Sequence, residues 1–492
     1  MFPPGFRPAA LVTLTLALAG GVAAAMYFAR LDLTLSHYDA RGHLLVARRI
    51  FDSLTPGWIQ IGAVWLPLPH LLNAIPVQWD WHYRTGVSGV VLSIVPLALG
   101  LSALAGYLAE RAGSVVVGVA VALAVLLNPS VLYLQSTPMT EPLLFGLSCL
   151  ALLAMDRWID APSSRRGRMV GVALVLLMLT RYEGWCVTGA LMGCAVMAHP
   201  RHAMRLALYP AAAVAGFLLL SFGSTGKWFV TSGFFEATNP ALGNPWLAIQ
   251  QIAHEATRLS HLGLVVIGVI GAVAALAQAW TERREGRAAI ARAVLPLALL
   301  AAAGLPLYAF TSGHPVRIRY MVSAVVALTV LSALVLGRLP RRFRAPAAVT
   351  ALVLLLVAVP PIDPDAPMVR EAQWDRPYSD ARRAVTAALA ERWDGSPILA
   401  SMGSLGHYMQ QMSHAGFHIR DFVHEGNGML WTLSVRAPER HVRWILIEES
   451  AEGGDVLAQR ARTSPEFLEH FTRTAEGGGV ALYVRTESGI RP

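Results

Sequence analysis

Long apolar runs alternate with short, arginine-containing stretches over the first 360 residues of the chain. Eleven of these runs are apolar enough for membrane helices, although several are shorter than the ~20 residues that cross the hydrocarbon core squarely. The fifth and sixth are close enough together to form one interrupted helix. The runs cover residues 8–29, 84–108, 114–130, 139–156, 169–181, 184–198, 204–222, 261–280, 291–310, 319–337 and 345–360. We therefore expect residues 1–360 to form an all-α polytopic membrane domain of about eleven transmembrane helices.

Residues 361–492 follow a different pattern. Residues 380–393 have the helical periodicity of an amphipathic helix. The apolar segments 397–401, 444–448 and 480–484 are short, as buried strands are. Because strands alternate with helices, we expect a small C-terminal α/β domain.

The composition also indicates a membrane protein. Apolar residues make up 55% of the 492 residues and charged residues 14%, about half the share usual in soluble proteins. The mean hydropathy of +0.49 excludes soluble globular, disordered, collagen-like and disulfide-scaffold proteins. Cys149, Cys186 and Cys194 lie in apolar runs and have no metal-ligand spacing. The formal charge of +9 lies mostly in short loops between apolar runs, which indicates membrane topology and no nucleic-acid partner.

The arginine positions predict the orientation of the chain. With a cytoplasmic N-terminus, the cytoplasmic connections hold 16 basic and 5 acidic residues, whereas the opposite side of residues 1–360 holds 10 basic and 8 acidic residues. The positive-inside rule supports this arrangement, and an odd number of spans makes residues 361–492 extracytoplasmic. The first run is longer than the apolar part of a signal peptide, so we expect an uncleaved helix rather than a cleaved signal. No Asn-x-Ser/Thr acceptor has a permissible middle residue, which favours the bacterial plasma (inner) membrane.

Two long external loops, residues 30–83 and 223–260, follow from this topology, and ionisable residues gather in the first. Residues 40–54 have an amphipathic pattern, which predicts a helix that lies in the membrane interface with Asp39 at its start. Its apolar face would hold Leu44, Ala47, Phe51 and Leu54, and its polar face Arg41, Arg48 and Asp52.

Two segments resemble the GT-C membrane glycosyltransferases. One is His37-Tyr-Asp-Ala-Arg41, an early aspartate in a long first external loop, and the other is Gln135-Ser-Thr-Pro-Met-Thr-Glu141-Pro, where a second external loop ends in an acid at a helix start. Segments 47–57 and 64–70 are also similar to the bacterial branch that groups with protein O-mannosyltransferases and the lipid A aminoarabinose transferase. The resemblance covers roughly residues 8–360.

The resemblance implies inverting transfer of a sugar from a polyprenyl-phosphate-linked donor, in the lipid bilayer, to a glycan, lipid or protein acceptor. It also implies that Asp39 acts as the base toward the acceptor hydroxyl, a role worth roughly 10²–10⁴ in rate. Many relatives carry an acidic pair at this place. Here Ala40 follows Asp39, so a second catalytic carboxylate would come from Glu141 or elsewhere.

A polyprenyl phosphate leaving group gains negative charge as the sugar departs, and arginine stabilises such charge with a bidentate fork. Arg317 and Arg319 precede the tenth run, and Arg181 stands beside Tyr182 and Glu183 at another outer boundary. These arginines are the candidate phosphate-binding residues. The other candidate residues of the site are His37, Tyr38, Arg41, His43, Tyr182 and Glu183.

Each candidate has a structural alternative. Asp39 is a favourable helix N-cap, and Glu141 complements a helix dipole. Arg317 and Arg319 would serve as interfacial anchors, and Arg181 would pair with Glu183. His37, Asp39 and His43 would suit a divalent metal, but no third imidazole follows at a fixed spacing. We predict no cofactor and leave a divalent metal open.

Two other functions fit a polytopic chain: a transporter or flippase of lipid-linked saccharides, and a glycan polymerase or ligase. A transporter would place charges within its spans and repeat its halves. Here the ionisable groups cluster on one face, which favours an enzyme at the outer interface.

Overall fold

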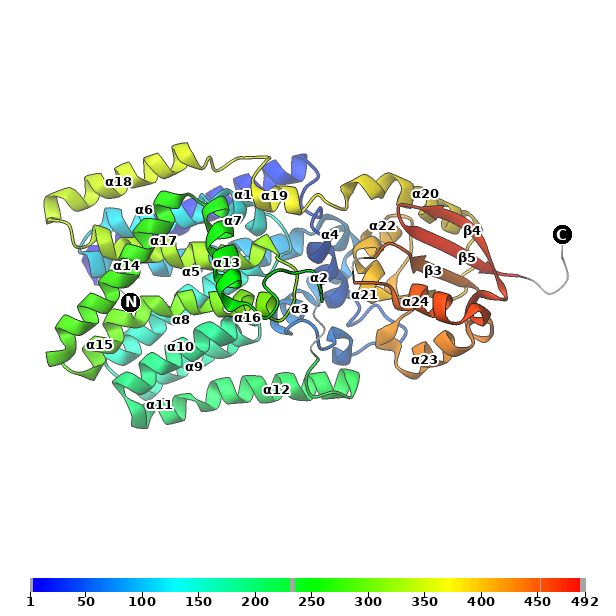
Figure 1. Cartoon of the computed structure of the whole chain (residues 1–492), viewed down its shortest axis with the longest axis horizontal. Coiled ribbons are helices and arrows are strands. Elements are labelled where there is room, and N and C mark those ends of the chain that lie inside the picture. Colours follow the sequence, from blue (N-terminus) through cyan, green and yellow to red (C-terminus); the bar gives the residue numbers. More distant parts are fainter. Residues whose placement is uncertain (1–2, 231–234, 452, 487–492) are drawn as a thin grey trace.

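The computed structural model describes residues 3–230, 235–451 and 453–486, so that part of the predicted loop 223–260 lies outside the described residues. A bundle of helices forms one end of an elongated molecule and a small sheet forms the other (Figure 1). All eleven apolar runs are helical, as predicted. They form α1 (Arg7–Arg30), α5 (Val87–Ala112), α6 (Val115–Leu126), α8 (Glu141–Asp160), α9 (Ser164–Met178), α10 (Glu183–Ala198), α12 (Leu208–Thr225), α14 (Leu262–Thr281), α15 (Arg287–Val294) continued by η5 (Leu295–Ala303) and α16 (Gly304–Thr311), α17 (Val322–Leu336) and α18 (Arg341–Ala358).

Not every helix of the bundle has the length of a membrane span. Seven helical stretches in the described part of the chain are long and apolar enough, and α6 with α7 (Pro129–Gln135) makes an eighth only if the pair, bent by 69°, is one span. The helices α9 and α10 have 15 and 16 residues. The fold class is therefore as predicted, whereas the number of eleven spans stays a prediction.

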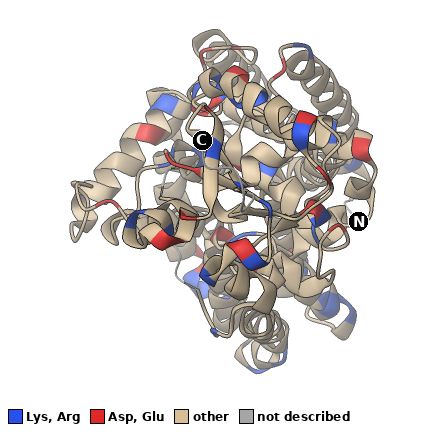
Figure 2. Ribbon diagram, turned by 90° about the vertical axis from the view of Figure 1, so that its right-hand side faces the viewer, with Lys and Arg blue, Asp and Glu red and all other residues tan. Residues whose placement is uncertain are grey.

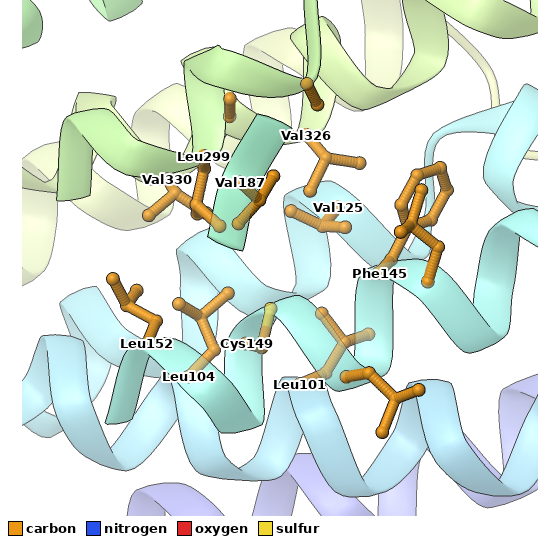
Figure 3. Close-up of a cluster of buried hydrophobic side chains, with 14 of the residues drawn as sticks. Leu101, Leu104, Val125, Phe145, Cys149, Leu152, Val187, Leu299, Val326 and Val330 are labelled. Carbon is orange, nitrogen blue, oxygen red and sulfur yellow. The ribbon is translucent and has the colours of Figure 1, made fainter. Parts of the chain in front are cut away.

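The core of the bundle forms where α5, α6, α8, α10, η5 and α17 meet (Figure 3). Side chains such as Leu104, Cys149 and Val330 point toward one another there and are buried. Gly100 of α5 and Gly146 of α8 lie so close that a Cβ on either would overlap the backbone of the other helix. Small residues at such a crossing allow two membrane helices to approach closely.

The loop that was predicted to be the first external one folds into short helices between the bundle and the sheet (Figure 1). They are α2 (Tyr38–Arg48), η2 (Trp58–Ile61), α3 (Leu68–Asn73) and α4 (Asp80–Thr85). The prediction of a surface helix over 40–54 is wrong in two respects. The helix ends at Arg48, and its predicted polar face is buried, with Arg48 and Asp52 only 3% and 5% exposed. Arg48 bonds Asp52 at 3.0 Å and Asp80 at 2.6 Å, which compensates these buried charges.

The C-terminal region forms a five-stranded mixed sheet in the order β2-β1-β3-β5-β4. The three predicted strands and the predicted amphipathic helix, α20 (Ser379–Arg392), are present. Acidic and basic positions are interspersed over this end of the molecule (Figure 2). The strands are β1 (Ile398–Ala400), β2 (Phe422–Val423), β3 (Trp444–Glu448), β4 (Phe471–Gly477) and β5 (Val480–Arg485). The other helices of the region are α19 (Pro367–Glu371), α21 (Met402–Leu405), α22 (Met409–His414), α23 (Met429–Arg436) and α24 (Val456–Thr463).

Candidate active site

Asp39 lies in the first turn of α2, which is the next helix along the chain after α1. The N-cap is His37, whose Nδ1 accepts the backbone N–H of Asp39 at 3.0 Å. The alternative that Asp39 itself caps the helix is therefore wrong. Because His37 Nδ1 accepts, the proton of a neutral imidazole sits on Nε2. The Asp39 carboxylate remains available to a residue from elsewhere in the chain.

That residue is Arg319, which hydrogen-bonds Asp39 through its Nη1. Arg319 lies in η6 (Ile318–Met321), the turn that leads into α17, and both side chains are largely buried at 12% and 15% exposure. Burial by itself raises the pKa of Asp39, but the positive charge of Arg319 and its hydrogen bond outweigh burial and hold the pKa well below its usual range. Asp39 is therefore a carboxylate at neutral pH.

A second ionic group lies beside this pair. Arg181, in the connection between α9 and α10, contacts Glu183 at 2.9 Å, Glu141 at 3.1 Å and the Thr140 hydroxyl at 2.9 Å. Glu141 and Glu183 are the first residues of α8 and α10, and both are buried. Both arginines act electrostatically on His43, and Glu141 acts on Arg319. The two groups thus form one cluster at the ends of α2, α8, α10 and α17.

His43, one turn after Asp39 on α2, has a fixed tautomer. His70 Nδ1 lies 3.1 Å from the Leu66 carbonyl oxygen, which can only accept, and His43 Nδ1 lies 3.1 Å from His70 Nε2. Burial lowers the pKa of both imidazoles, that of His70 to about 3, so both are neutral. His70 therefore donates to Leu66 and accepts from His43, and His43 presents an unprotonated Nε2. Sequence analysis missed His70, because only the fold brings it to His43.

Glu371 is the second residue that sequence analysis missed. It ends α19, in the C-terminal region, and its Oε1 lies 3.9 Å from His37 Nε2. Its Oε2 accepts the backbone N–H of Ile318 at 3.1 Å. Burial by itself raises the pKa of Glu371, but the nearby His37 and the charge of Arg319 lower it. Glu371 therefore contacts both His37, the N-cap of α2, and the η6 turn that carries Arg319. No local sequence motif identifies Glu371.

Four other candidates lie at the edge of this cluster or face away from it. The Tyr38 hydroxyl donates to the Ser404 carbonyl at 2.9 Å, and Arg41 pairs with Asp375 at 2.8 Å, so both side chains face the C-terminal region. The Tyr182 hydroxyl lies 3.3 Å from the Val64 carbonyl. Arg317 is half-buried at the N-terminal end of η6. The structure thus brings together Asp39, Glu141, Arg181, Glu183, His37, His43 and Arg319.

The metal alternative has no structural support. Within residues 3–230, 235–451 and 453–486, no three His, Cys, Asp or Glu side chains are arranged to hold a metal ion. The chemistry of the cluster is that of carboxylates and guanidinium groups, which suits proton transfer beside a phosphate.

No protein-family model and no curated protein matches the chain. Several solved structures do match the chain. ArnT from Cupriavidus metallidurans matches over 96% of this chain and 98% of its own, with TM-score 0.56 and 12% identity when bound to undecaprenyl phosphate, and 0.54 and 13% in the apo state. The apo oligosaccharyltransferase of Archaeoglobus fulgidus has TM-score 0.47 at 12% identity, over 98% of this chain and 75% of that one. The ArnT match includes the C-terminal region as well as the bundle, and the chain therefore has the GT-C fold of membrane glycosyltransferases.

Proposed function

We propose that the chain is a membrane glycosyltransferase. It moves a sugar from a polyprenyl-phosphate-linked donor to a hydroxyl group of an extracytoplasmic glycan, lipid or protein, with inversion. The largely buried Asp39–Arg319 pair beside Arg181 supports the proposal, because a carboxylate suited to act as a base lies next to two guanidinium groups suited to bind a phosphate. The bundle, residues 1–360, would be the catalytic domain, and residues 361–492 an extracytoplasmic domain that supports it.

The donor phosphate would compete with Asp39 for Arg319. Arginine binds phosphate through two parallel hydrogen bonds, so the phosphate offers the guanidinium a strong alternative partner. Once Arg319 binds the phosphate, its charge no longer offsets the effect of burial on Asp39. Burial then raises the pKa of Asp39 and makes the carboxylate a stronger base. In this mechanism, donor binding and base activation are one event.

Transfer then proceeds in a single displacement. Asp39 takes the proton of the acceptor hydroxyl while the hydroxyl oxygen forms a bond to the anomeric carbon of the sugar. The bond from that carbon to the phosphate oxygen breaks, and its electron pair leaves with the polyprenyl phosphate. Arg319 and Arg181 stabilise the charge that develops on this phosphate. The unprotonated His43 Nε2 would accept a hydrogen bond from a further substrate hydroxyl.

Glu141 and Glu183 have a positioning role in this mechanism. Both contact Arg181, and the two carboxylates fix a buried guanidinium that would otherwise have many rotamers. Glu141 is thus engaged by Arg181, and we do not assign it as a second base beside Asp39. The active site would face away from the cytoplasm, at the outer surface of a bacterial plasma membrane.

The experiment is a binding titration of the purified protein in detergent with undecaprenyl phosphate, and native mass spectrometry measures the bound fraction. We expect Arg319→Ala to weaken binding about ten- to hundredfold, because a hydrogen bond to a charged group is lost. Arg317→Ala tests the neighbouring arginine. Arg258→Ala, an exposed arginine that pairs with Glu255 on α13 (Pro245–Leu259), is the control and should bind as the wild type does. Unchanged binding in Arg319→Ala would refute the phosphate-binding role of Arg319, whatever the result for Arg317→Ala.

A further inference from the structure

A cavity of about 760 Å³ lies at the end of the bundle farthest from the sheet (Figure 1). Its walls are the C-terminal ends of α5, α14 and α17, the last turns of α8, and α15. Its volume is within the range of small-molecule sites. The residues that matter for its chemistry are Tyr107, Arg111, Asp156, Glu282, Glu285 and Arg338.

The cavity is distinct from the Asp39 cluster, because the two lie at opposite ends of the same helices. Glu141 begins α8, and Asp156 lies fifteen residues later, about 22 Å along the helix axis. Arg319 precedes α17, and Arg338 follows it, about 28 Å away. This separation is close to the ~30 Å thickness of a bilayer hydrocarbon core. The cavity therefore lies at the level of the lipid headgroups on the other side of the membrane.

The cavity offers donors to an anion. Arg338 donates to the carbonyl oxygens of Leu334 and Ala274, and within the part of the chain that the structure describes no carboxylate pairs with it. The Arg111 Nε and the Tyr107 hydroxyl are buried without a hydrogen-bond partner among the same residues. A polar ligand in the cavity would give these two buried donors the partner that they lack.

The same cavity also offers acceptors to a cation. Asp156 is engaged by Arg111 at 2.7 Å and by Arg292 at 3.2 Å. Glu282 accepts a hydrogen bond from Gln278 at 2.6 Å, but neither Glu282 nor the exposed Glu285 has an ion pair among the described residues. One arginine without a carboxylate and two glutamates without a cation are complementary to a molecule that carries both signs of charge.

The outer face of α14 indicates that this molecule is a lipid. Gly268 and Gly271 pack α14 against α17, whereas Val273, Leu276 and Trp280 are 57–69% exposed on the side toward the bilayer. Acyl chains would lie along this apolar face, and tryptophan is enriched at the membrane interface. A soluble ligand has no acyl chains and would leave this apolar face uncovered.

We propose that this cavity binds the headgroup of a zwitterionic phospholipid with a primary ammonium group, such as phosphatidylethanolamine. Arg338, with Arg111 and Tyr107, holds the phosphate. Glu282 and Glu285 hold the ammonium, whose N–H donors a quaternary choline headgroup lacks. The bound lipid joins the ends of α5, α14 and α17 and is independent of the reaction at the Asp39 cluster.

The test is native mass spectrometry of the delipidated full-length protein in detergent, titrated separately with phosphatidylethanolamine, phosphatidylglycerol and phosphatidylcholine. We expect selective retention of phosphatidylethanolamine. Arg338→Gln should weaken it about tenfold or more, because a charge-assisted hydrogen bond is lost. Arg338→Lys keeps the charge and should lose less. Arg201→Gln is the control, since Arg201 is exposed in α11 (Pro200–Leu206) and does not line the cavity.

Glu282→Gln with Glu285→Gln should remove the preference for phosphatidylethanolamine over phosphatidylglycerol, because the groups that hold the ammonium are neutralised. Equal retention of the three lipids by the wild type would overturn the proposal. So would unchanged retention in Arg338→Gln, provided that this variant elutes as the folded protein does in gel filtration. Retention of soluble O-phosphoethanolamine without retention of the lipid would also overturn it.

Discussion

At the scale of single residues, the site depends on how Arg319 controls Asp39. While the two are paired, the guanidinium charge stabilises the carboxylate and makes it a weak base. In the proposed mechanism, the donor phosphate draws Arg319 away and removes that restraint. The same two residues would therefore keep the empty site inactive and make the occupied site reactive.

Asp39→Asn should leave an inserted, folded protein and lower sugar transfer about 10²–10⁴-fold, because the amide cannot take the proton of the acceptor. The measurement is transfer from labelled polyprenyl-phosphate sugars in membrane vesicles. Asp32→Asn is the matched control, since Asp32 lies in the same loop, is exposed and has a positive φ that asparagine tolerates. Transfer by Asp39→Asn above about a tenth of the wild-type rate would show that another group is the base.

Residue types and positions along the chain were enough to predict Asp39, Arg319, Arg181 and Glu141 as neighbours in a site. Each stands at the end of a predicted helix, and the topology places these ends on one side of the membrane. Glu371 was not predictable in this way. It comes from the C-terminal region, and it reaches His37 only because α19 packs against the bundle.

At the scale of the elements, the position of Glu141 depends on how α8 packs against α5. Gly146 lies one and a half turns after Glu141, and an added Cβ would overlap the backbone of α5 at Pro96. A backbone cannot yield as a flexible side chain does, so that a methyl group there separates the helices.

Gly146→Ala should destabilise the protein by about 1–3 kcal/mol and lower its thermal unfolding midpoint in detergent. Gly193→Ala in α10 is the matched control, because an added Cβ there meets no described atom within 4 Å. Alanine is a better helix former than glycine by about 1 kcal/mol, so this variant should unfold at the wild-type midpoint or above it. Equal midpoints for the two variants would contradict the close contact between α5 and α8.

The strand β3 carries a carboxyl group that should make stability depend on pH. Glu448 is 5% exposed and lies 3.1 Å from Arg382. Burial raises its pKa from 4.5 to about 7, more than Arg382 lowers it. A group whose pKa is higher in the folded state stabilises the fold below its unfolded pKa, and this stability is lost as the pH rises from 4.5 through 7.

Glu448→Gln should therefore remove part of the fall in the unfolding midpoint between pH 5 and pH 8. Thermal unfolding followed by tryptophan fluorescence at both pH values measures this difference. Glu449→Gln is the control, since Glu449 is the next residue and its side chain is 40% exposed in a surface pair with Arg473. If the unfolding midpoints of Glu448→Gln and of the wild type fall by the same amount between pH 5 and pH 8, burial does not raise the pKa of Glu448.

Periodicity predicted the long helices and the three buried strands because their patterns are local. It did not predict β2, which has two residues, or β4, of whose seven residues only one is buried. It also placed α2 on a surface. The pattern of α2 is amphipathic, but Arg48 and Asp52 on its polar side are buried against Asp80 and the backbone of the C-terminal region, a partner that a local pattern cannot reveal.

At the scale of the whole molecule, the loop between α1 and α5 forms a layer that contacts both the bundle and the C-terminal region. Gln410 of the C-terminal region donates to the Arg41 carbonyl at 3.0 Å, and Asp52 accepts the backbone N–H of Ile419 at 3.2 Å. These two contacts come from the C-terminal region, and on the bundle side Arg319 pairs with Asp39. The C-terminal region would position the catalytic helix and, through Glu371, the turn of Arg319.

The most direct test of the proposed glycosyl transfer is mass spectrometry of cell-envelope glycans from the source organism with and without this gene. We expect the deletion strain to lose a sugar substituent. The wild-type gene should restore that substituent, whereas the Asp39→Asn gene, expressed at the same level, should not. Identical glycans in the presence and absence of the gene, or full restoration by Asp39→Asn, would contradict the account.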